Sequence, residues 1–509
     1  MEKIKEYKKI IQFHLLLNIL FGAIISLACY VHIPLGDIKS IVIYSIHFLI
    51  LQFTVSGFLY ILSLSKRIFL ILFPILFFLL SSISFWVYAQ DITINPGMIQ
   101  AILESNIDIS LDVFSLQYGL FLFLSIVCIL FISEKYKKLH GSTFKFPLFI
   151  LSIAAISILF LAENYRTGVL RRKLPYSLFY SVKKYLKKPN IQLKQVTQNI
   201  TSKKDSLHII FVLGESVRAD HLSLNGYNRL TTPLLAKQKN IVSFPNIYTP
   251  LTYTAISVPQ ILSDKSVLDS IQNKVTSMYS ILKNAGYKTE WIGNQSLEKS
   301  YEGIVRTNKK VLIVDRFHSV LSFKKEKDLV LLNEFKHPKI GAKNKISTLH
   351  MIGSHWYYNN RVDNRFIIFK PIVTSKYVGS STNEELINSY DNTILYLDFF
   401  LDKLITKLKK TDQQTILIYL SDHGETLGEN GQWFHAQENK SSQNPALIVW
   451  FSEKFKQQNF NKVANLISNQ KDSISTDFLF HSILDVSGIN GFNFKIKESI
   501  FYKKNEKIQ

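Results

Sequence analysis

The stretch that decides the fold is Thr415-Ile416-Leu417-Ile418-Tyr419-Leu420-Ser421-Asp422-His423-Gly424-Glu425, in which an apolar run meets a polar pentad. The apolar part, residues 415–420, is typical of a buried parallel strand. Open α/β sheets bind ligands at the carboxyl ends of such strands, so Asp422 and His423 are predicted to lie at a binding edge. Adjacent strand residues point to opposite faces. Both side chains therefore reach one ion only if the backbone turns sharply, and Gly424 would permit that turn.

A second stretch has the same form. Residues 208–213, His-Ile-Ile-Phe-Val-Leu, predict a strand that Gly214 ends, and Glu215 follows it. Carboxylate and imidazole groups are common zinc ligands. Glu215 is therefore predicted to converge with the Asp-His pair on one metal ion, whereas the alternative for either stretch alone is a solvated loop. A hydroxyl would complete the set, and the candidates are Ser216, Thr252, Thr254 and Ser257.

Length and charge narrow the class of protein. A chain of 509 residues is too long for one ordinary core, and two domains are expected. The net charge of +22 resembles that of a nucleic-acid-binding protein, but no basic helix or RNA-binding aromatic motif is present. Contact with anionic lipid headgroups explains the charge at least as well, and no nucleic-acid partner is expected. The two cysteines, Cys29 and Cys128, lie in apolar segments and cannot crosslink the rest of the chain.

Apolar segments crowd the first third of the chain. Each approaches or exceeds the length that crosses about 30 Å of hydrocarbon. The five segments are residues 11–31, 40–64, 68–89, 116–132 and 146–163. They predict an N-terminal transmembrane domain of five helices, residues 1–165. No small-residue cleavage site follows the first segment, which favours a membrane anchor over a removable signal.

The loops between these segments predict the orientation. Basic residues gather in the amino-terminal tail, in the turn at 66–67 and in the turn at 135–145, whereas the loop 90–115 contains no Lys or Arg. By the positive-inside rule the amino terminus is cytoplasmic, and five crossings place everything after residue 165 outside. The loop 90–115 then lies on the outer side, where residues 98–103 resemble a short interfacial helix that lines a lipid-accessible site. A solvated connector is the alternative.

Two further segments complete the chain. Residues 166–205 interleave basic and aromatic side chains, which predicts a linker lying on lipid headgroups. Residues 206–509 alternate helix and strand patterns, which predicts an α/β domain with a mostly parallel sheet sandwiched by helices. The candidate helices are residues 274–285, 384–408 and 476–486, and the further candidate strands are residues 288–292 and 446–451.

Three more histidines follow strand-like runs: His350, His355 and His435. A single histidine is more often a structural residue than a ligand. Three of them in loops of one domain favour a second metal site or a site for a substrate phosphate.

Several motifs together resemble those of the phosphoethanolamine transferases that modify lipid A and related glycans, a family that includes the mobile colistin-resistance enzymes. The matching stretches are FVLGESVRAD at 211–220, SLNGY at 223–227, TYTAISVP at 252–259, SYDNT at 389–393 and SDHGE at 421–425. The five apolar segments extend the resemblance to essentially the whole chain. The resemblance implies an alkaline-phosphatase/sulfatase-like fold, a bacterial inner-membrane enzyme with a periplasmic catalytic domain, and a part in polymyxin resistance.

The resemblance also implies roles for particular residues. The nucleophile is the second Thr of a Thr-x-Thr-Ala segment, which is Thr254 here. The implied zinc ligands are Glu215, Thr254, Asp422 and His423. The implied residues near the substrate phosphate or a second zinc are His355 and His435, and those on the substrate side are His350, Gln295, Lys299 and Thr252. Gln295 stands where the family usually has Asn.

These assignments predict a two-step, ping-pong transfer by a monomeric enzyme. Thr254, activated by zinc, attacks phosphatidylethanolamine, and the resulting phosphothreonine passes phosphoethanolamine to lipid A or another envelope glycan, with His355 or His435 as proton donor. One alternative is a phosphoglycerol transferase of the lipoteichoic-acid-synthase type. Another is a non-catalytic membrane protein that binds a glycolipid.

Two features depart from the family pattern. The family's soluble domain usually carries disulfides, whereas this chain has none there, and Gln260 stands where a Cys commonly occurs. In the loop after the third apolar segment the family tends to show Asn, Thr and Glu at positions that are Ala101, Ser105 and Ile109 here. These changes bear on the donor and the acceptor more than on the catalytic residues.

Overall fold

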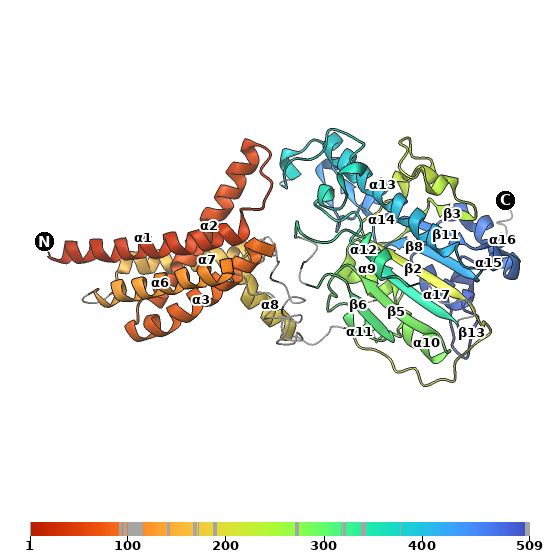
Figure 1. Cartoon of the computed structure of the whole chain (residues 1–509), viewed down its shortest axis with the longest axis horizontal. Coiled ribbons are helices and arrows are strands. Elements are labelled where there is room, and N and C mark those ends of the chain that lie inside the picture. Colours follow the sequence, from red (N-terminus) through yellow and green to blue (C-terminus); the bar gives the residue numbers. More distant parts are fainter. Residues whose placement is uncertain are drawn as a thin grey trace. The chain divides into compact units, whose positions relative to one another are not determined.

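The computed structural model describes residues 2–90, 94, 99, 116–139, 143–165, 170–171, 173–186, 191–269, 274–316, 318, 322–336, 343–376 and 378–503. The chain forms two compact units, each drawn in Figure 1. The first unit comprises residues 1–187, 317–324 and 374–380, and the second comprises the remaining residues to 509. The predicted helix at 98–103 and the positions Ala101, Ser105 and Ile109 lie outside the described residues, apart from Ile99.

The first unit is helical. Its helices are α1 (Glu2–Cys29), α2 (Ile38–Leu62), α3 (Lys66–Gln90), α6 (Leu116–Lys137), α7 (Phe146–Tyr165) and α8 (Tyr176–Leu186). Within the described residues, α1, α2, α3 and α6 are long and apolar enough to cross a bilayer, and the apolar stretch of α7, Phe146–Leu161, is shorter. A helix forms at each of the five predicted segments, so this part of the chain has four to five apolar helices, of which four are long enough to cross a bilayer.

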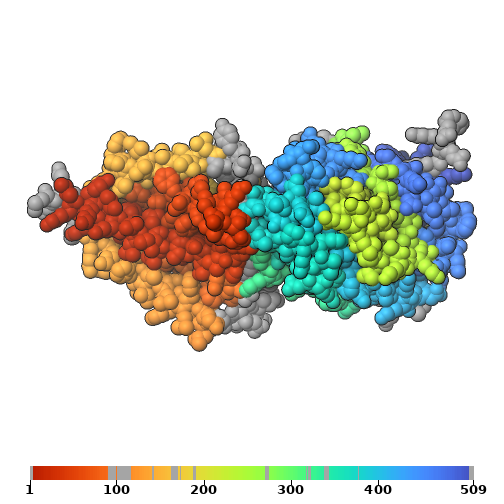
Figure 2. Space-filling model, turned by 90° about the horizontal axis from the view of Figure 1, so that it is seen from above, coloured from red at the N-terminus to blue at the C-terminus, as the bar shows by residue number. Residues whose placement is uncertain are grey.

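In Figure 2 the red residues of the first two helices lie along the middle of this unit, with orange residues of later helices on both sides. Small and polar side chains join these helices. A Cβ on Gly57 of α2 would lie 3.0 Å from the Cβ of Ala155 in α7, so glycine permits the close approach of the two helices. The Gln52 side chain donates to Asn18 Oδ1 at 2.9 Å between α2 and α1. Such a bond supplies a specific contact that apolar helix surfaces in lipid lack.

The second unit is built around a seven-stranded sheet. In spatial order its strands are β3 (Ile241–Phe244), β11 (Leu447–Phe451), β8 (Thr415–Ser421), β2 (His208–Gly214), β7 (Lys345–His350), β5 (Lys288–Gly293) and β6 (Lys310–Ile313). Strand β11 runs antiparallel to the other six strands of this sheet, which are parallel to one another. The prediction of a mostly parallel sheet is therefore confirmed. The four predicted strands agree with β2, β5, β8 and β11 to within one residue at each end.

Helices cover both faces of this sheet, as predicted (Figure 1). On one face, Ile209, Phe211 and Leu213 of β2 share a core with α10 (Met278–Asn284), α16 (Phe460–Ser468) and α17 (Phe478–Val486). The other face of the sheet, to which His208 of β2 points, is covered by α12 (Val330–Glu334) and α13 (Asn383–Leu408). Phe335, directly after α12, stacks on the His208 ring, and Lys407 of α13 donates to the Phe335 carbonyl. Burial on both faces explains why β2 and β8 are continuous apolar runs in the sequence.

Candidate active site

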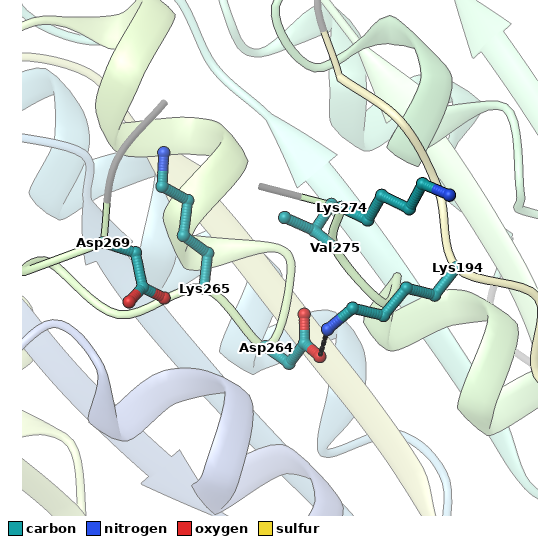
Figure 3. A pocket seen from close by; sticks show the side chains of 6 residues that line it. All are labelled: Lys194, Asp264, Lys265, Asp269, Lys274 and Val275. Carbon is teal, nitrogen blue, oxygen red and sulfur yellow. Dashed lines mark hydrogen bonds and ion pairs between the residues drawn. The ribbon is translucent and has the colours of Figure 1, made fainter. Parts of the chain in front are cut away.

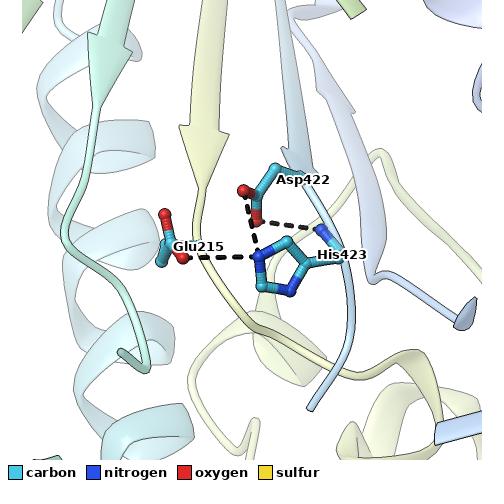
Figure 4. A group of neighbouring side chains, drawn as sticks. All are labelled: Glu215, Asp422 and His423. Atoms are coloured by element: carbon cyan, nitrogen blue, oxygen red, sulfur yellow. Dashed lines mark hydrogen bonds and ion pairs between the residues drawn. The ribbon is translucent and has the colours of Figure 1, made fainter. Parts of the chain in front are cut away.

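Two neighbouring strand ends bring three potential ligands together. Strands β2 and β8 pair in parallel with Gly214 opposite Ser421, and the Asp422 amide donates to the Gly214 carbonyl at 3.2 Å. Figure 4 shows the resulting cluster of Glu215, Asp422 and His423, whose ligand atoms all lie within 4.8 Å of one another. His423 Nε2 is 3.3 Å from Asp422 Oδ2 and 3.5 Å from Glu215 Oε1. All three side chains are buried.

The backbone differs between the two strand ends. At the end of β2, Ser216 lies in the left-handed region, with φ of 60°, whereas Gly424, at the end of β8, has no positive φ. Glycine is needed there for space, because a Cβ on Gly424 would lie 2.0 Å from the Ser441 carbonyl oxygen. The strained turn is instead carried by a residue for which this conformation is uncommon.

Hydrogen bonds hold the Ser216 turn on two sides. The Tyr390 hydroxyl of α13 donates to the Ser216 carbonyl at 2.7 Å and accepts from the Arg218 amide at 2.9 Å. Asp422 Oδ1 accepts from the Ser216 amide at 3.2 Å and from the His423 amide at 2.9 Å. Burial raises the pKa of Tyr390 well above its usual range, so the hydroxyl keeps the proton that it donates.

Among the four candidate hydroxyls, that of Thr254 has the closest contacts with the cluster. Thr254 is the first residue of α9 (Thr254–Ile261), and its Oγ1 donates to the Glu215 carboxylate, 3.0 and 3.1 Å from the two oxygens. The same Oγ1 is 3.5 Å from His423 Nε2. The Ser216 and Ser257 hydroxyls are farther from their nearest carboxylate oxygens, at 3.4 and 3.5 Å. A helix N-terminus also favours an anion such as a phosphoryl group beside Thr254.

The chemistry of these groups fits a bound cation. His423 Nδ1 lies 2.8 Å from the Gly424 carbonyl, which can only accept, so Nδ1 carries a proton. Burial, together with the charge of Glu215, raises the pKa of Asp422 to about 7. Burial opposes a charge on His423, but the carboxylates of Asp422 and Glu215 raise its pKa to about 10. Positive charge is therefore favoured where the three groups meet, and a divalent metal with O and N ligands supplies it.

Two of the further histidines lie beside this cluster. The ring centroid of His435 is 5.1 Å from that of His423 and 5.7 Å from that of His355. Burial lowers the pKa of His355 to about 4. Burial also acts on His435, but the Glu425 carboxylate, 3.6 Å from its Nδ1, raises the pKa of His435. Neighbouring groups whose pKa values are shifted in opposite directions are suited to acid and base roles.

The backbone around His435 is unusual. Phe434 and Ala436 flank it with φ of 69° and 64°, in the left-handed region that non-glycine residues rarely adopt. The Ala436 amide donates to the Thr252 carbonyl at 2.7 Å, which ties this loop to the segment that enters α9. Thr252 is buried and acts here through its backbone. Strain of this kind often marks a functional site.

The remaining predicted residues lie in different surroundings. His350 ends β7 and is fully buried, with its ring 5.1 Å from that of Trp291 and 6.0 Å from that of Tyr301. Gln295 donates to Met351 O at 2.6 Å and to Glu215 Oε2 at 3.3 Å. Lys299 is partly exposed in the segment after β5.

Sequence reasoning missed several residues that shape the site. Glu425 accepts from the Tyr358 hydroxyl at 2.9 Å, and its place inside the 421–425 pentad was a signal. Asp328 accepts from the Ile352 and Gly353 amides, both at 2.9 Å, and so holds the turn beside Glu215. No sequence pattern marks Asp328, because its partners lie on another strand end.

A surface pocket of about 280 Å³ lies elsewhere in the second unit (Figure 3). Its described lining residues are Lys194, Asp264, Lys265, Asp269, Lys274 and Val275. Lys194 forms an ion pair with Asp264 at 3.2 Å. Because these lining residues include no histidine and no hydroxyl, the buried cluster is the stronger candidate for catalysis.

Two family models match the chain. The Sulfatase model matches residues 208–489, and the model described as phosphoethanolamine transferase EptA/EptB matches residues 53–189. Phosphoethanolamine transferase EptA of Helicobacter pylori is 30% identical over 438 residues, which cover 81% of each chain. EptA of Escherichia coli strain K12 is 33% identical over 297 residues, 55% of this chain and 53% of that one. The chain thus aligns with about half the length of the E. coli relative.

Solved structures agree with these matches. The soluble domain of lipooligosaccharide phosphoethanolamine transferase A from Neisseria meningitidis is 29% identical, with a TM-score of 0.54, over 61% of this chain and 98% of that one. The integral membrane protein of the same name is 23% identical, with a TM-score of 0.54, over 94% and 97%. This second match extends over both units and shows a similar fold.

Proposed function

Because the chain belongs to the phosphoethanolamine transferase family of the sulfatase superfamily, we propose that it transfers phosphoethanolamine from phosphatidylethanolamine to lipid A or another envelope glycan. The names of E. coli relatives support it: phosphoethanolamine transferase EptA, phosphatidylethanolamine transferase Mcr-1 and Kdo(2)-lipid A phosphoethanolamine 7''-transferase. The observation that carries the proposal is the place of Thr254 Oγ1, within 3.0 to 3.5 Å of the Glu215 carboxylate and His423 Nε2.

The metal in this proposal is zinc, held by Glu215, Thr254, Asp422 and His423. When bound, zinc acts as a Lewis acid that lowers the pKa of a coordinated hydroxyl. Glu215 accepts the hydrogen bond of the Thr254 hydroxyl and so holds its oxygen beside the cluster. Three side chains would hold the metal, and the fourth position would be taken by the reactive oxygen of Thr254, which suits nucleophilic catalysis.

The transfer has two steps. The Thr254 hydroxyl, whose pKa bound zinc would lower, first loses its proton to solvent. Thr254 Oγ1 then attacks the phosphorus of phosphatidylethanolamine, the bond from phosphorus to the diacylglycerol oxygen breaks, and His435 donates a proton to that oxygen. An oxygen of the acceptor then attacks phosphothreonine, His355 or His435 takes any proton that this oxygen loses, and the Thr254 oxygen is released in its deprotonated form. His435 suits the acid role because Glu425 raises its pKa.

Location follows from the membrane segments and the substrates. The proposal places the helical unit in the bacterial inner membrane and the catalytic domain, residues 206–509, in the periplasm, with residues 166–205 as the interfacial linker. A lipid donor and a lipid-linked acceptor are both reached at the outer face of that membrane. Addition of phosphoethanolamine reduces the negative charge of lipid A, so we infer that the enzyme, acting as a monomer, contributes to polymyxin resistance.

The test is to trap the covalent intermediate. The full-length enzyme is incubated in detergent with phosphatidylethanolamine and no acceptor, and peptides are analysed by mass spectrometry. The expected result is a phosphoethanolamine adduct on Thr254. A phosphoglycerol adduct formed only from phosphatidylglycerol would favour the lipoteichoic-acid-synthase type, and no adduct from either lipid would favour a glycolipid-binding protein.

A further inference from the structure

We propose that Gln295 is a positioning residue that orients the Glu215 carboxylate for metal binding, and that it does not bind the substrate head group. The inference rests on the proposed function, because it assigns a role at the same metal centre. It also concerns a position at which this chain has a longer amide side chain than the Asn expected there.

The sheet brings Gln295 to Glu215 across one intervening strand. In register, His350 of β7 lies opposite Leu213 of β2 on one side and Gly293 of β5 on the other. Gln295 therefore leaves the sheet two strands away from Glu215, a separation of about 9.5 Å at the usual strand spacing. Its amide crosses the end of β7 and contacts both neighbours, Met351 O and Glu215 Oε2.

Both donors of the Gln295 amide are committed to these contacts. Met351 O is a carbonyl oxygen and can only accept, so the nitrogen of the amide must face it, at 2.6 Å. The second hydrogen of the same nitrogen is directed to Glu215 Oε2, at 3.3 Å. The side chain is also 7% exposed. An amide in this arrangement has no N–H left for a lipid phosphate.

Hydrogen bonds that do not involve the Gln295 side chain hold the backbone at the exit of β5 and at Glu215. Asn294 donates to Asp328 Oδ1 at 3.0 Å and to the Glu326 carbonyl at 2.8 Å, which fixes the exit of β5. The Ser354 amide donates to the Glu215 carbonyl at 2.9 Å. The Glu215 side chain, in contrast, is contacted by Thr254, His423 and Gln295 and, at 3.4 Å, by the Ser216 hydroxyl. Of these, Gln295 and Ser216 lie outside the proposed ligand set, and Gln295 is the one that comes from another strand end.

The length of the side chain matters for this role. Asn is one methylene shorter than Gln, and with the β5 exit fixed it loses reach by about one carbon–carbon bond, roughly 1.5 Å. An Asn amide at this position can therefore keep one of the two bonds but not both. Gln at 295 gives the metal ligand an outer partner that orients it, the arrangement that raises metal affinity in other sites.

The experiment measures zinc affinity and donor kinetics separately on the full-length enzyme in detergent. Gln295→Met keeps the length and removes both hydrogen bonds, and Gln295→Asn keeps the amide and shortens it. Zinc Kd is obtained by competition with a chelating dye, and kcat and KM for phosphatidylethanolamine are obtained at saturating zinc. Both variants are expected to raise the zinc Kd about 10- to 100-fold, with KM for the lipid changed less than about twofold.

Two control variants separate the outcomes. Lys299→Met, at the other predicted head-group position, is expected to raise KM for the lipid and leave zinc Kd unchanged. Asp422→Ala is expected to lose zinc. If Asp422→Ala loses zinc but folded Gln295→Met and Gln295→Asn keep the wild-type zinc Kd, the Gln295 role is rejected and the metal centre stands. If Asp422→Ala binds zinc as the wild type does, the metal centre itself is rejected, and the Gln295 role with it.

Discussion

The ends of β2 and β8 and the loops that carry His355 and His435 meet at one site but are built differently. At the strand ends, pairing of Gly214 with Ser421 places Glu215 and Asp422 side by side, and the ligand side chains are fully buried. The two histidines lie on loops, and the His435 side chain is 30% exposed. Sheet register therefore places Glu215 and Asp422, whereas contacts between distant loops place His355 and His435.

In the proposed mechanism, the ends of β2 and β8 hold the metal, and the loop residues His355 and His435 transfer protons. The metal cluster is held by a continuous hydrogen-bonded sheet, which gives its atoms little freedom. His355 and His435 depend on the Arg361 contact to the His355 carbonyl at 2.8 Å and the Ala436 contact to Thr252. Substitutions in the first region are expected to abolish metal binding, and those in the second to slow the reaction with metal still bound.

The largest effect is expected at the β8 end. Asp422→Ala or His423→Ala removes a ligand from a fully buried cluster, so tightly bound zinc and activity are both lost, the latter by at least about 10³-fold. That exceeds the 10- to 100-fold cost of losing an outer partner of a ligand. Metal content by mass spectrometry and turnover of phosphatidylethanolamine measure the two losses. Full zinc content in both variants would show that the ends of β2 and β8 do not form the metal site.

Thr254 sharpens the comparison, because it contacts the cluster of Glu215 and His423 and is the proposed nucleophile. Thr254→Ala is expected to reduce transfer by at least about 10³-fold, since no other oxygen occupies its place, while Glu215, Asp422 and His423 still bind much of the zinc. Ser216→Ala serves as the matched control and is expected to remain measurably active. Full activity in Thr254→Ala would show that another residue forms the intermediate.

His435 tests the second region. His435→Gln removes the proton donor and keeps a polar side chain of similar size, so kcat is expected to fall about 10²- to 10⁴-fold. Zinc content should match that of the wild type, because His435 lies outside the cluster of convergent ligands. Loss of zinc in this variant would contradict the separation between the two regions.

Tyr390 connects the metal cluster to the helical layer, and its expected effect is smaller. Tyr390→Phe leaves the buried Ser216 carbonyl and Arg218 amide without their hydroxyl partner, at a cost of about 1–3 kcal/mol for each unsatisfied group. The strained turn at Ser216 is then less well held, so zinc affinity is expected to fall about tenfold. Denaturant unfolding and zinc titration measure the two effects.

A second tyrosine of α13 is the matched control for this prediction. The Tyr396 hydroxyl accepts from the Leu329 amide at 3.0 Å, away from the Ser216 turn. Tyr396→Phe leaves one group, the Leu329 amide, without its partner, so it is expected to lower stability by about 1–3 kcal/mol and leave zinc affinity unchanged. Equal loss of zinc in both variants would mean that general destabilisation, and not the turn, controls the metal site.

The two regions also differ in how far sequence predicts them. Continuous apolar runs reveal β2 and β8, and the polar residues that follow each run then identify Glu215, Asp422 and His423. The left-handed turn at Ser216 was not predicted, because Gly214 and Gly424 were more obvious candidates. Their actual role is close packing, which depends on Tyr419 and Ser441 and is invisible in a local pattern.

Loop contacts explain the other differences. The motifs identify His355 and His435, but their opposite pKa shifts depend on Glu425 and on burial, which only the folded chain establishes. His350 follows a strand-like run as His355 does, and the structure places its ring 5.1 and 6.0 Å from those of Trp291 and Tyr301. No motif contains Asp328, and the SYDNT motif contains Tyr390 without indicating its contact, because each of the two residues acts on a residue of another element.

The smallest effect is expected at Gln260, which replaces the family's Cys near the end of α9. Its side chain donates to Asp477 Oδ1 at 2.8 Å and accepts from the Thr476 hydroxyl at 2.9 Å, so hydrogen bonds tie the nucleophile's helix to the start of α17. Gln260→Ala leaves the buried Thr476 hydroxyl without this partner, whereas half-buried Asp477 still accepts from Ser266 and Val267, so stability is expected to fall by about 1–3 kcal/mol. Zinc affinity should not change, because these contacts lie at the opposite end of α9 from Thr254. Thermal unfolding of the wild type and of Gln260→Ala measures this loss. A Gln260→Ala variant as stable as the wild type would show that another link secures this helix.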